Sequence, residues 1–243
     1  MTEPRTEVPP LDCRTKALFL DFDGTLVDIA PTPDAVIIPA DLGSLLARLN
    51  TALGGALAIV SGRSLKELES FLRGFDGIMV GSHGSEARGM TPPLDRLPEG
   101  LESAQTEMRD YATSRGLLYE HKSMGGAIHF RALPDAGPEV EAFIERLAIT
   151  NPRFEVQPAK MAFELRPAGF SKDGALQILS DQPDFRNRSP IYIGDDTTDE
   201  PALAWAETHG GFGIKVGDGK TRASQHLPDP AAVLDWLRAG LEH

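Results

Sequence analysis

The 243-residue chain carries 24 Lys and Arg against 36 Asp and Glu, a formal net charge of -12, so we do not expect it to bind a nucleic-acid backbone. Its single cysteine, Cys13, excludes an intramolecular disulfide and favours a reducing compartment. The opening residues, MTEPRTEVPP, lack the apolar segment of a secretory signal, and no apolar run approaches the roughly 20 residues that cross a bilayer. We therefore expect a cytoplasmic protein.

Short apolar runs alternate with helix-period stretches at both ends of the chain. The runs predict strands at 17–21, 55–60, 77–81, 190–194 and 212–216. The periodic stretches predict helices at 41–52, 64–73, 171–180 and 198–207, and Ser64 with Glu67 has the pattern of a capping box. This alternation predicts an α/β fold with a parallel-sheet, Rossmann-like core and helices on both faces.

The middle of the chain has a different pattern. Helices are predicted at 99–115 and 138–149, and strands at 117–122, 126–131, 153–157 and 160–166. The order αββαββ predicts a small α+β domain inserted into the core. We expect core residues at 1–93, an inserted cap at 94–168 and the rest of the core at 169–243.

Two carboxylates follow the first predicted strand, in the stretch LFLDFDGTLVD. Asp21 and Asp23 are two residues apart, so in an extended chain both side chains point to the same side. Adjacent carboxylates repel each other unless a proton or a cation lies between them. The alternative is an ordinary turn at Asp23 and Gly24, with Asp21 ending the strand.

Ser61, Gly62 and Arg63 follow the second predicted strand. A hydroxyl, a close-approach glycine and a guanidinium at a strand exit are able to bind a phosphoryl oxygen. The alternative is that Ser61 simply begins a loop. Lys172 lies at a predicted helix start, where its charge opposes the helix dipole, and a surface lysine is the plain alternative.

The fourth predicted strand exit carries GDDTTDE, residues 194–200. Asp199 and Glu200 suit the first turn of a helix, but helix capping does not explain both Asp195 and Asp196 directly at the strand exit. If this exit adjoins that of strand 17–21, several carboxylates converge, and such an oxygen-rich set suits Mg²⁺.

These groups together suit one reaction. A carboxylate, Asp21, attacks phosphorus to form an aspartyl-phosphate, and Asp23 protonates the leaving oxygen and then activates water. Mg²⁺ neutralises the charges while Lys172 and Ser61 hold the phosphoryl oxygens.

The same four motifs, DFDGTLVD, SGR, the Lys of SKDGAL and GDDTTDE, resemble those of the haloacid dehalogenase-like phosphatases. The resemblance implies that Asp21 is the nucleophile and Asp23 the acid/base. It also implies a Mg²⁺ site formed by Asp21, the Asp23 carbonyl and Asp195, with Asp196 and Asp199 supporting it or binding as auxiliary ligands.

GSHGSE (81–86), EHKSMGGAIHFR (120–131) and FELRP (163–167) narrow the resemblance to the trehalose-6-phosphate phosphatases. It implies that Glu120, Lys122 and Glu164 bind the distal sugar, and that His83 and Glu86 lie near the hinge. The alternative for His83 and Glu86 is that they only hold a turn. In the predicted strands, residues two apart share a face: Glu120 with Lys122, His129 with Arg131, and Glu164 with Arg166. Met161, Phe163 and Leu165 are expected on the buried face. A solvated sheet face with ion pairs is the alternative for the charged residues.

We therefore expect a Mg²⁺-dependent phosphatase that converts trehalose 6-phosphate to trehalose and phosphate. The expected partner is a small phosphosugar, with no nucleic acid, membrane or obligate protein partner. Sucrose phosphate and mannosylglycerate phosphate are alternative substrates. A phospho-accepting receiver-like module is the alternative from a different class, and it would need neither Asp23 nor a cap.

Overall fold

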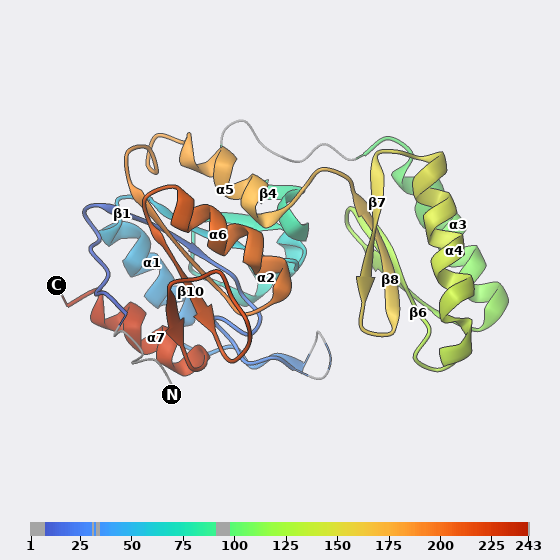
Figure 1. Cartoon of the computed structure of the whole chain (residues 1–243), viewed down its shortest axis with the longest axis horizontal. Coiled ribbons are helices and arrows are strands. Elements are labelled where there is room, and N and C mark those ends of the chain that lie inside the picture. The colour runs from blue at the N-terminus through green and yellow to red at the C-terminus, as the bar shows by residue number, and fades with distance from the viewer. Residues whose placement is uncertain (1–7, 31, 33–34, 91–97, 243) are drawn as a thin grey trace. The chain divides into compact units, whose positions relative to one another are not determined.

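The computed structural model describes residues 8–30, 32, 35–90 and 98–242, and the chain divides into two compact units (Figure 1). Residues 95–170 form the second unit, and the chain on either side of it forms the first. The predicted boundary at residues 93 and 94 lies outside the described residues. Within the described part of the chain, no helix has the length and apolar character needed to cross a membrane.

The first unit is built on a seven-stranded sheet in the order β11-β10-β9-β1-β2-β3-β4. Its strands are β1 (Lys16–Leu20), β2 (Leu57–Val60), β3 (Ile78–Gly81), β4 (Glu86–Arg88), β9 (Ser189–Gly194), β10 (Phe212–Val216) and β11 (Gln225–Leu227). Its α-helices are α1 (Leu42–Ala52), α2 (Leu65–Phe71), α5 (Lys172–Ser180), α6 (Glu200–Thr208) and α7 (Pro230–Ala239), and its short 3₁₀ turns are η2 (Ser82–Gly84) and η4 (Thr197–Asp199).

The inner strands of this sheet are buried along their length. Every residue of β2 and β3 is buried, as are four of the five residues of β1. Successive strand residues point to opposite faces, so helices must cover both faces of the sheet (Figure 1). Parallel pairing requires such helical crossovers, because a tight turn cannot join parallel strands. The predicted α/β class, with helices on both faces of a sheet, is confirmed.

The core of the sheet is parallel, as predicted, but its two short outer strands were not predicted from the sequence. β4 pairs antiparallel with β3, and β11 extends the other edge. Both are three residues long and lack the apolar run that identifies a strand in sequence. Helix α7 was also not predicted, although the Asp229 side chain caps it and Pro230 occupies its first turn.

The second unit is a four-stranded antiparallel sheet, in the order β5-β6-β8-β7, covered by two helices. Its elements are α3 (Leu101–Arg115), β5 (Leu118–Lys122), β6 (Gly125–His129), η3 (Pro134–Ala136), α4 (Gly137–Thr150), β7 (Phe154–Ala159) and β8 (Ala162–Pro167). Ile128, Phe163 and Leu165 belong to its apolar core, with side chains of both helices.

Two strand predictions in this unit are wrong at their ends. β6 ends at His129, so Arg131 lies in the following turn and does not share its face. Met161 lies in the hairpin between β7 and β8, with a φ of 58°, and not on the buried face of a strand. A two-residue hairpin here brings Ala159 opposite Ala162, which sets the start of β8.

Candidate active site

Three adjacent strands of the first unit place the predicted catalytic motifs at one edge of the sheet. β1 lies between β9 and β2 and runs parallel to both, with Leu20 opposite Ile193 and Ile59. Their carboxyl ends therefore meet, and the loops that follow them carry Asp21, Ser61 and Asp195. This edge is where ligands bind in open α/β sheets.

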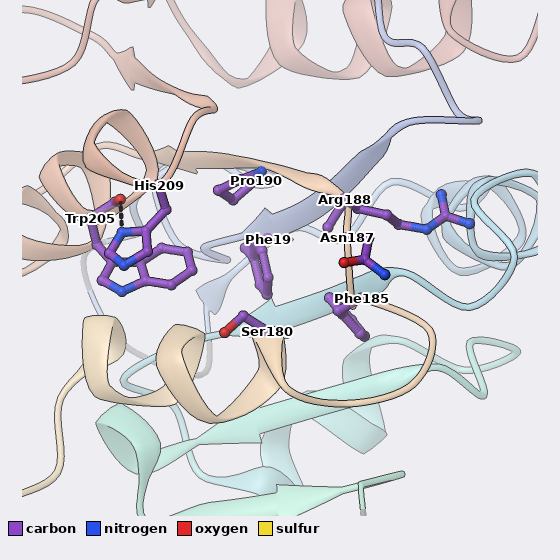
Figure 2. Close-up of a pocket in the computed structure, with 9 residues that line it drawn as sticks. Phe19, Ser180, Phe185, Asn187, Arg188, Pro190, Trp205 and His209 are labelled. Carbon is purple, nitrogen blue, oxygen red and sulfur yellow. Dashed lines mark hydrogen bonds between the residues drawn. The ribbon is translucent and has the colours of Figure 1, made fainter.

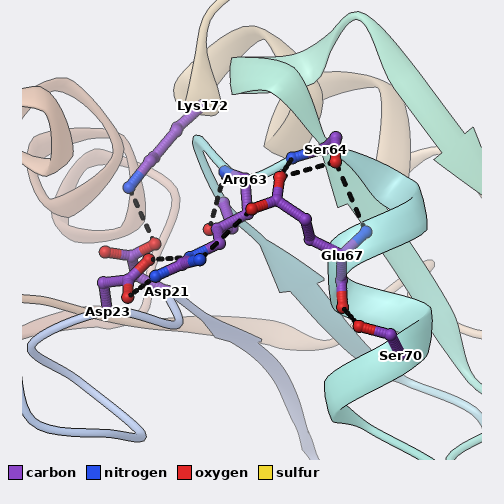
Figure 3. Close-up of polar contacts among 8 residues, drawn as sticks. Asp21, Asp23, Arg63, Ser64, Glu67, Ser70 and Lys172 are labelled. Carbon is purple, nitrogen blue, oxygen red and sulfur yellow. Dashed lines mark hydrogen bonds and ion pairs between the residues drawn. The ribbon is translucent and has the colours of Figure 1, made fainter. Parts of the chain in front are cut away.

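Asp21 is buried at the exit of β1, with 4% of its surface exposed. Its backbone N–H donates to the carbonyl of Ile193, and its Oδ1 lies 2.9 Å from Lys172 Nζ (Figure 3). Burial raises the pKa of Asp21 well above its ordinary value, and the Asp199 carboxylate raises it further, against the lowering effect of Lys172. The Lys172 ammonium is thus the cation nearest to a strongly desolvated carboxyl group.

Lys172 is not the solvated lysine of the alternative interpretation. It is 4% exposed and lies between Asp21 and Asp199, with its Nζ 2.7 Å from Asp199 Oδ1. Burial alone would lower the pKa of Lys172, but the Asp21 and Asp199 carboxylates raise it above the ordinary value. Ser171 accepts the N–H of Gly174 and caps α5, which places Lys172 at the first position of the helix. The two ion pairs offset the unfavourable helix dipole at this position.

Asp199 is fully buried and serves as the centre of a hydrogen-bond network. Its Oδ1 accepts bonds from Lys172 and from the hydroxyl of Tyr192, at 2.7 and 2.5 Å. Its Oδ2 accepts the backbone N–H groups of Asp195 and Asp196, at 3.1 and 3.0 Å. Asp199 therefore holds both the lysine and the loop after β9.

The other acidic residues of this loop point in different directions. Oxygens of Asp21, Asp195 and Asp199 lie within 4.8 Å of one another, whereas the Asp196 side chain caps η4 by accepting the N–H groups of Thr197 and Thr198. Burial, followed by repulsion from Asp199 and Asp196, raises the pKa of Asp195 to about 6. The pKa of Asp196 is lowered, because its bonds to Thr197 and Thr198 outweigh its burial.

Gly24 is required by the close approach of two loops. Its φ is 69°, and a β-carbon on it would come within 2.1 Å of Asp195 Oδ2. A side chain here would displace Asp195 or distort the turn after β1. The glycine that follows Asp23 in the sequence therefore determines how near the β1 and β9 loops approach each other.

The Ser61–Arg63 loop lies beside Asp23. Ser61 is 1% exposed, and its Oγ accepts the backbone N–H of Arg63. A β-carbon on Gly62 would come within 2.6 Å of the His83 ring. The Arg63 guanidinium pairs with Asp23 at 2.7 Å (Figure 3).

His83 lies in the tight turn after β3, and Glu86 is the first residue of β4, which follows that turn. His83 has a φ of 55°, and its backbone N–H donates to the carbonyl of Ser61. Glu86 Oε2 accepts the backbone N–H of Leu65 and the hydroxyl of Ser82, at 2.9 and 2.8 Å. These bonds tie the turn to the start of α2, so Glu86 has a clear structural role.

In the second unit, the predicted sugar-binding residues share the sheet face opposite the helices. Glu120 and Glu164 both lie opposite Ala127 of β6. Lys122 pairs with Glu164 at 2.5 Å, and His129 with Glu120 at 2.7 Å. The His129 hydrogen bond lowers the pKa of Glu120 against the effect of burial. Each carboxylate of this face thus has a neighbouring cation or imidazole.

Two buried polar residues of the site were not predicted from the sequence. Tyr192 contributes its hydroxyl from within β9, and Lys215 of β10 donates to the carbonyls of Asp195 and Val216, at 2.5 and 2.7 Å. A tyrosine and a lysine inside otherwise apolar strands, PIYIG and FGIKV, are the signals that were available. Buried polar groups in such strands require a partner.

The described residues of the first unit line at least two hollows. One of about 400 Å³ lies beside Asp195 and is lined by Gly24, Lys215 and the 217–218 and 228–230 loops, among others. A second, of about 150 Å³, lies near the start of β1 and β9, where Trp205 stacks on His209 at 4.0 Å (Figure 2). The second hollow is lined by Ala17 and Pro190, among others, and therefore lies at the opposite end of β1 and β9 from Asp21.

The chain is similar to proteins of known name along almost its whole length. A family model described as trehalose-phosphatase matches residues 19–231. The trehalose-6-phosphate phosphatase of Escherichia coli (strain K12) is 34% identical over 98% of this chain and 90% of that protein.

Solved structures agree with the sequence comparisons. A trehalose-6-phosphate phosphatase related protein superimposes with a TM-score of 0.78 and 29% identity, over 93% of this chain and 97% of the other. A haloacid dehalogenase-like hydrolase from Bacteroides thetaiotaomicron has a TM-score of 0.66 at 17% identity, over 93% and 99%, and shows the shared fold. The chain belongs to the trehalose-phosphatase family of phosphoric monoester hydrolases, built on the haloacid dehalogenase-like fold.

Proposed function

We propose that this chain hydrolyses trehalose 6-phosphate to trehalose and phosphate through an aspartyl-phosphate on Asp21. The observation that carries the proposal is the buried contact of Asp21 with Lys172, at a sheet edge where Asp23, Ser61 and Asp195 also emerge. The substrate follows from the names of relatives, such as the Escherichia coli trehalose-6-phosphate phosphatase.

In the first step, an Asp21 oxygen attacks phosphorus as the bond to the sugar oxygen breaks. Asp23 donates its proton to that leaving oxygen, so no free alkoxide forms. Lys172 and the Ser61 hydroxyl are proposed to hold non-bridging phosphoryl oxygens, because charge on them must be stabilised throughout. In the second step, Asp23 takes a proton from water, the water oxygen attacks phosphorus, and the bond to Asp21 breaks to release phosphate.

A divalent cation suits this group of carboxylates. Asp21, Asp195 and Asp199 place oxygens within 4.8 Å of one another, while Lys172 supplies only one positive charge to two of them. The pKa of Asp195 is raised first by its burial and then by repulsion from Asp199 and Asp196, so a cation beside it would favour the charged form. We propose Asp21 and Asp195 as the principal Mg²⁺ ligands, with the Asp23 carbonyl from the family resemblance. When bound, Mg²⁺ would supply the positive charge that permits a phosphate dianion to approach these carboxylates.

The side chains of Asp199 and Asp196 are already engaged in hydrogen bonds within the protein. Asp199 already accepts four hydrogen bonds, and Asp196 caps η4. We propose that they fix the loop that presents Asp195. We place the reaction in the cytoplasm, where the single Cys13 would remain reduced.

Phosphate release from a panel of sugar phosphates tests the proposal. With Mg²⁺, trehalose 6-phosphate should release many equivalents of phosphate per protein. Its rate of phosphate release should exceed the rates for sucrose phosphate and mannosylglycerate phosphate. EDTA should stop the reaction, and added Mg²⁺ should restore it. Asp21→Asn should abolish turnover while the melting temperature shows a folded protein, because an amide does not attack phosphorus. Turnover by Asp21→Asn, or full activity in metal-free protein, would overturn the mechanism.

A further inference from the structure

Arg63 holds the Asp23 carboxylate with a two-pronged ion pair (Figure 3). Its Nε lies 2.7 Å from Asp23 Oδ2, and its Nη2 lies 2.8 Å from Asp23 Oδ1. The two residues are 40 positions apart and follow adjacent strands, β1 and β2. A guanidinium that binds both oxygens of a carboxylate fixes its orientation as well as its position.

Arg63 is itself held on its other side by α2. Its Nη1 lies 3.2 Å from Glu67 Oε1, and Glu67 Oε2 accepts the N–H and hydroxyl of Ser64 in the capping box. The guanidinium carbon also lies 5.2 Å from the centre of the Phe71 ring. The Arg63 side chain is only 10% exposed. Contacts with the capping box in the first turn and with the last residue of α2 thus leave this guanidinium little freedom to move.

Asp23 needs such a support more than Asp21 does. Its side chain is 36% exposed, whereas that of Asp21 is 6% exposed and contacts Lys172. A half-exposed aspartate in a turn would otherwise sample several rotamers. An acid/base group acts only from within hydrogen-bond reach of the reacting oxygen, and small displacements from that position are costly.

We infer that Arg63 is a positioning residue that aims the Asp23 carboxyl group at the leaving oxygen, and not a ligand of the substrate phosphate as the sequence suggested. The inference rests on the proposed function, because it assigns Asp23 the acid/base role. It predicts that Arg63 affects the reaction only through Asp23, so its effect depends on how much the leaving group needs a proton.

Two substrates separate these roles. The leaving group of trehalose 6-phosphate is a sugar alkoxide that needs a proton, whereas the leaving group of p-nitrophenyl phosphate is a stable phenolate. Arg63→Met should lower kcat/KM for trehalose 6-phosphate by about 10-fold to 100-fold, the scale of a misplaced acid/base group, and should scarcely change it for the aryl ester. Because kcat/KM reports only steps through release of the leaving group, the later hydrolysis of the aspartyl-phosphate does not affect the comparison. Arg63→Lys keeps the charge but loses the planar guanidinium that binds both carboxylate oxygens, so its kcat/KM values should resemble those of Arg63→Met.

A double-mutant cycle gives the second readout. In an Asp23→Asn background, Arg63→Met should cause no further loss, since residues that act as one unit are not additive. Inhibition by inorganic phosphate should be the same in Arg63→Met and wild type. Arg88→Met is the matched control, because Arg88 also pairs with α2, through Glu69 at 3.4 Å, but has no contact with Asp23.

The outcomes are distinguishable. An equal loss on both substrates, weaker phosphate inhibition or an additive double mutant would overturn the inference and restore Arg63 as a phosphate ligand or a structural residue. If Asp23→Asn itself fails to discriminate between the two substrates, the acid/base assignment in the proposed function fails instead. Melting temperatures of all variants identify a folding defect, in which case the comparison rests on Arg63→Lys.

Discussion

The carboxylates of the site have distinct environments, which explains how similar residues can have different tasks. Asp199 accepts four hydrogen bonds, one of them from Lys172, and is fully buried. Asp196 caps a turn, and Asp23 pairs with Arg63. Asp195 has Asp199 and Asp196 as like-charged neighbours and a pKa of about 6. A bound cation would relieve the repulsion between Asp195 and these two carboxylates.

The burial of Asp195, together with this repulsion, predicts that Asp195→Asn stabilises the metal-free protein. A carboxyl group whose pKa is raised on folding binds protons more tightly when folded, so its ionisation lowers stability as pH rises from about 4 to 6. The neutral amide escapes this loss. We expect a gain of about 1 kcal/mol at pH 7.5, after allowing for solvent screening, and a smaller gain at pH 5.

Melting temperatures in EDTA at the two pH values measure the effect. Asp218→Asn is the control, because Asp218 is an exposed carboxylate that lines the same hollow as Asp195. It should leave the melting temperature unaltered. Equal or lower stability of Asp195→Asn at pH 7.5 would show that Asp195 is not electrostatically strained. Mg²⁺ should raise the melting temperature of wild type and not that of Asp195→Asn.

At the scale of elements, side-chain caps determine where the helices around the site begin. Ser64 and Ser171 cap α2 and α5, and the Ser64 cap was predicted from the sequence. Asp229 caps α7 by accepting the N–H of Ala232 at 2.8 Å, and Val233 and Leu237 bury one face of that helix. An N-cap satisfies a backbone donor that the helix cannot pair by itself.

We predict that Asp229→Ala lowers the stability of the protein by about 1 kcal/mol, which corresponds to about 2–4 °C in melting temperature for a chain of this size. Asp229→Asn keeps a capping oxygen and should match wild type. Thermal unfolding of the three proteins tests this. If the Asn and Ala variants lose stability equally, the charge of Asp229 matters and its capping oxygen does not.

At the scale of the whole molecule, a second unit with a paired charged face accompanies the catalytic unit. Lys122 with Glu164, and His129 with Glu120, line the sheet face opposite α3 and α4. Sugar hydroxyls both donate and accept hydrogen bonds, so such a face suits a disaccharide. The proposed role of these residues is to select a substrate with a second ring.

Glucose 6-phosphate should therefore be hydrolysed at least about 10²-fold less efficiently than trehalose 6-phosphate, because its binding leaves polar groups of the receptor unpaired. Lys122→Ala should reduce this ratio by slowing the disaccharide reaction alone. The kcat/KM values for both substrates measure it. Arg115→Ala, which removes a pair with Glu139 between the two helices, is the control and should alter neither value. An equal loss on both substrates would make Lys122 a structural residue.

The elements that were predicted from the sequence carry long apolar or periodic patterns. β10 was predicted with its observed bounds, because FGIKV is an apolar run with clear ends. β4 has only the sequence EAR, and its place at the sheet edge depends on pairing with β3. α7 was missed although its signals were present in the Asp-Pro start and the spacing of Val233 and Leu237.

By itself, the sequence determined which end of the parallel strands carries the candidate catalytic residues: apolar runs that end in DFD, SGR and GDD, together with a lysine at a helix start, are local patterns. The tertiary structure alone decided which charges meet. It joined Asp23 to Arg63, Lys172 to both Asp21 and Asp199, and Tyr192 to Asp199. The physical reason is that a local pattern sets the direction of a side chain along its own strand. Its partner, however, depends on strand order, on the close approach of loops and on burial, and these arise only when distant segments pack together.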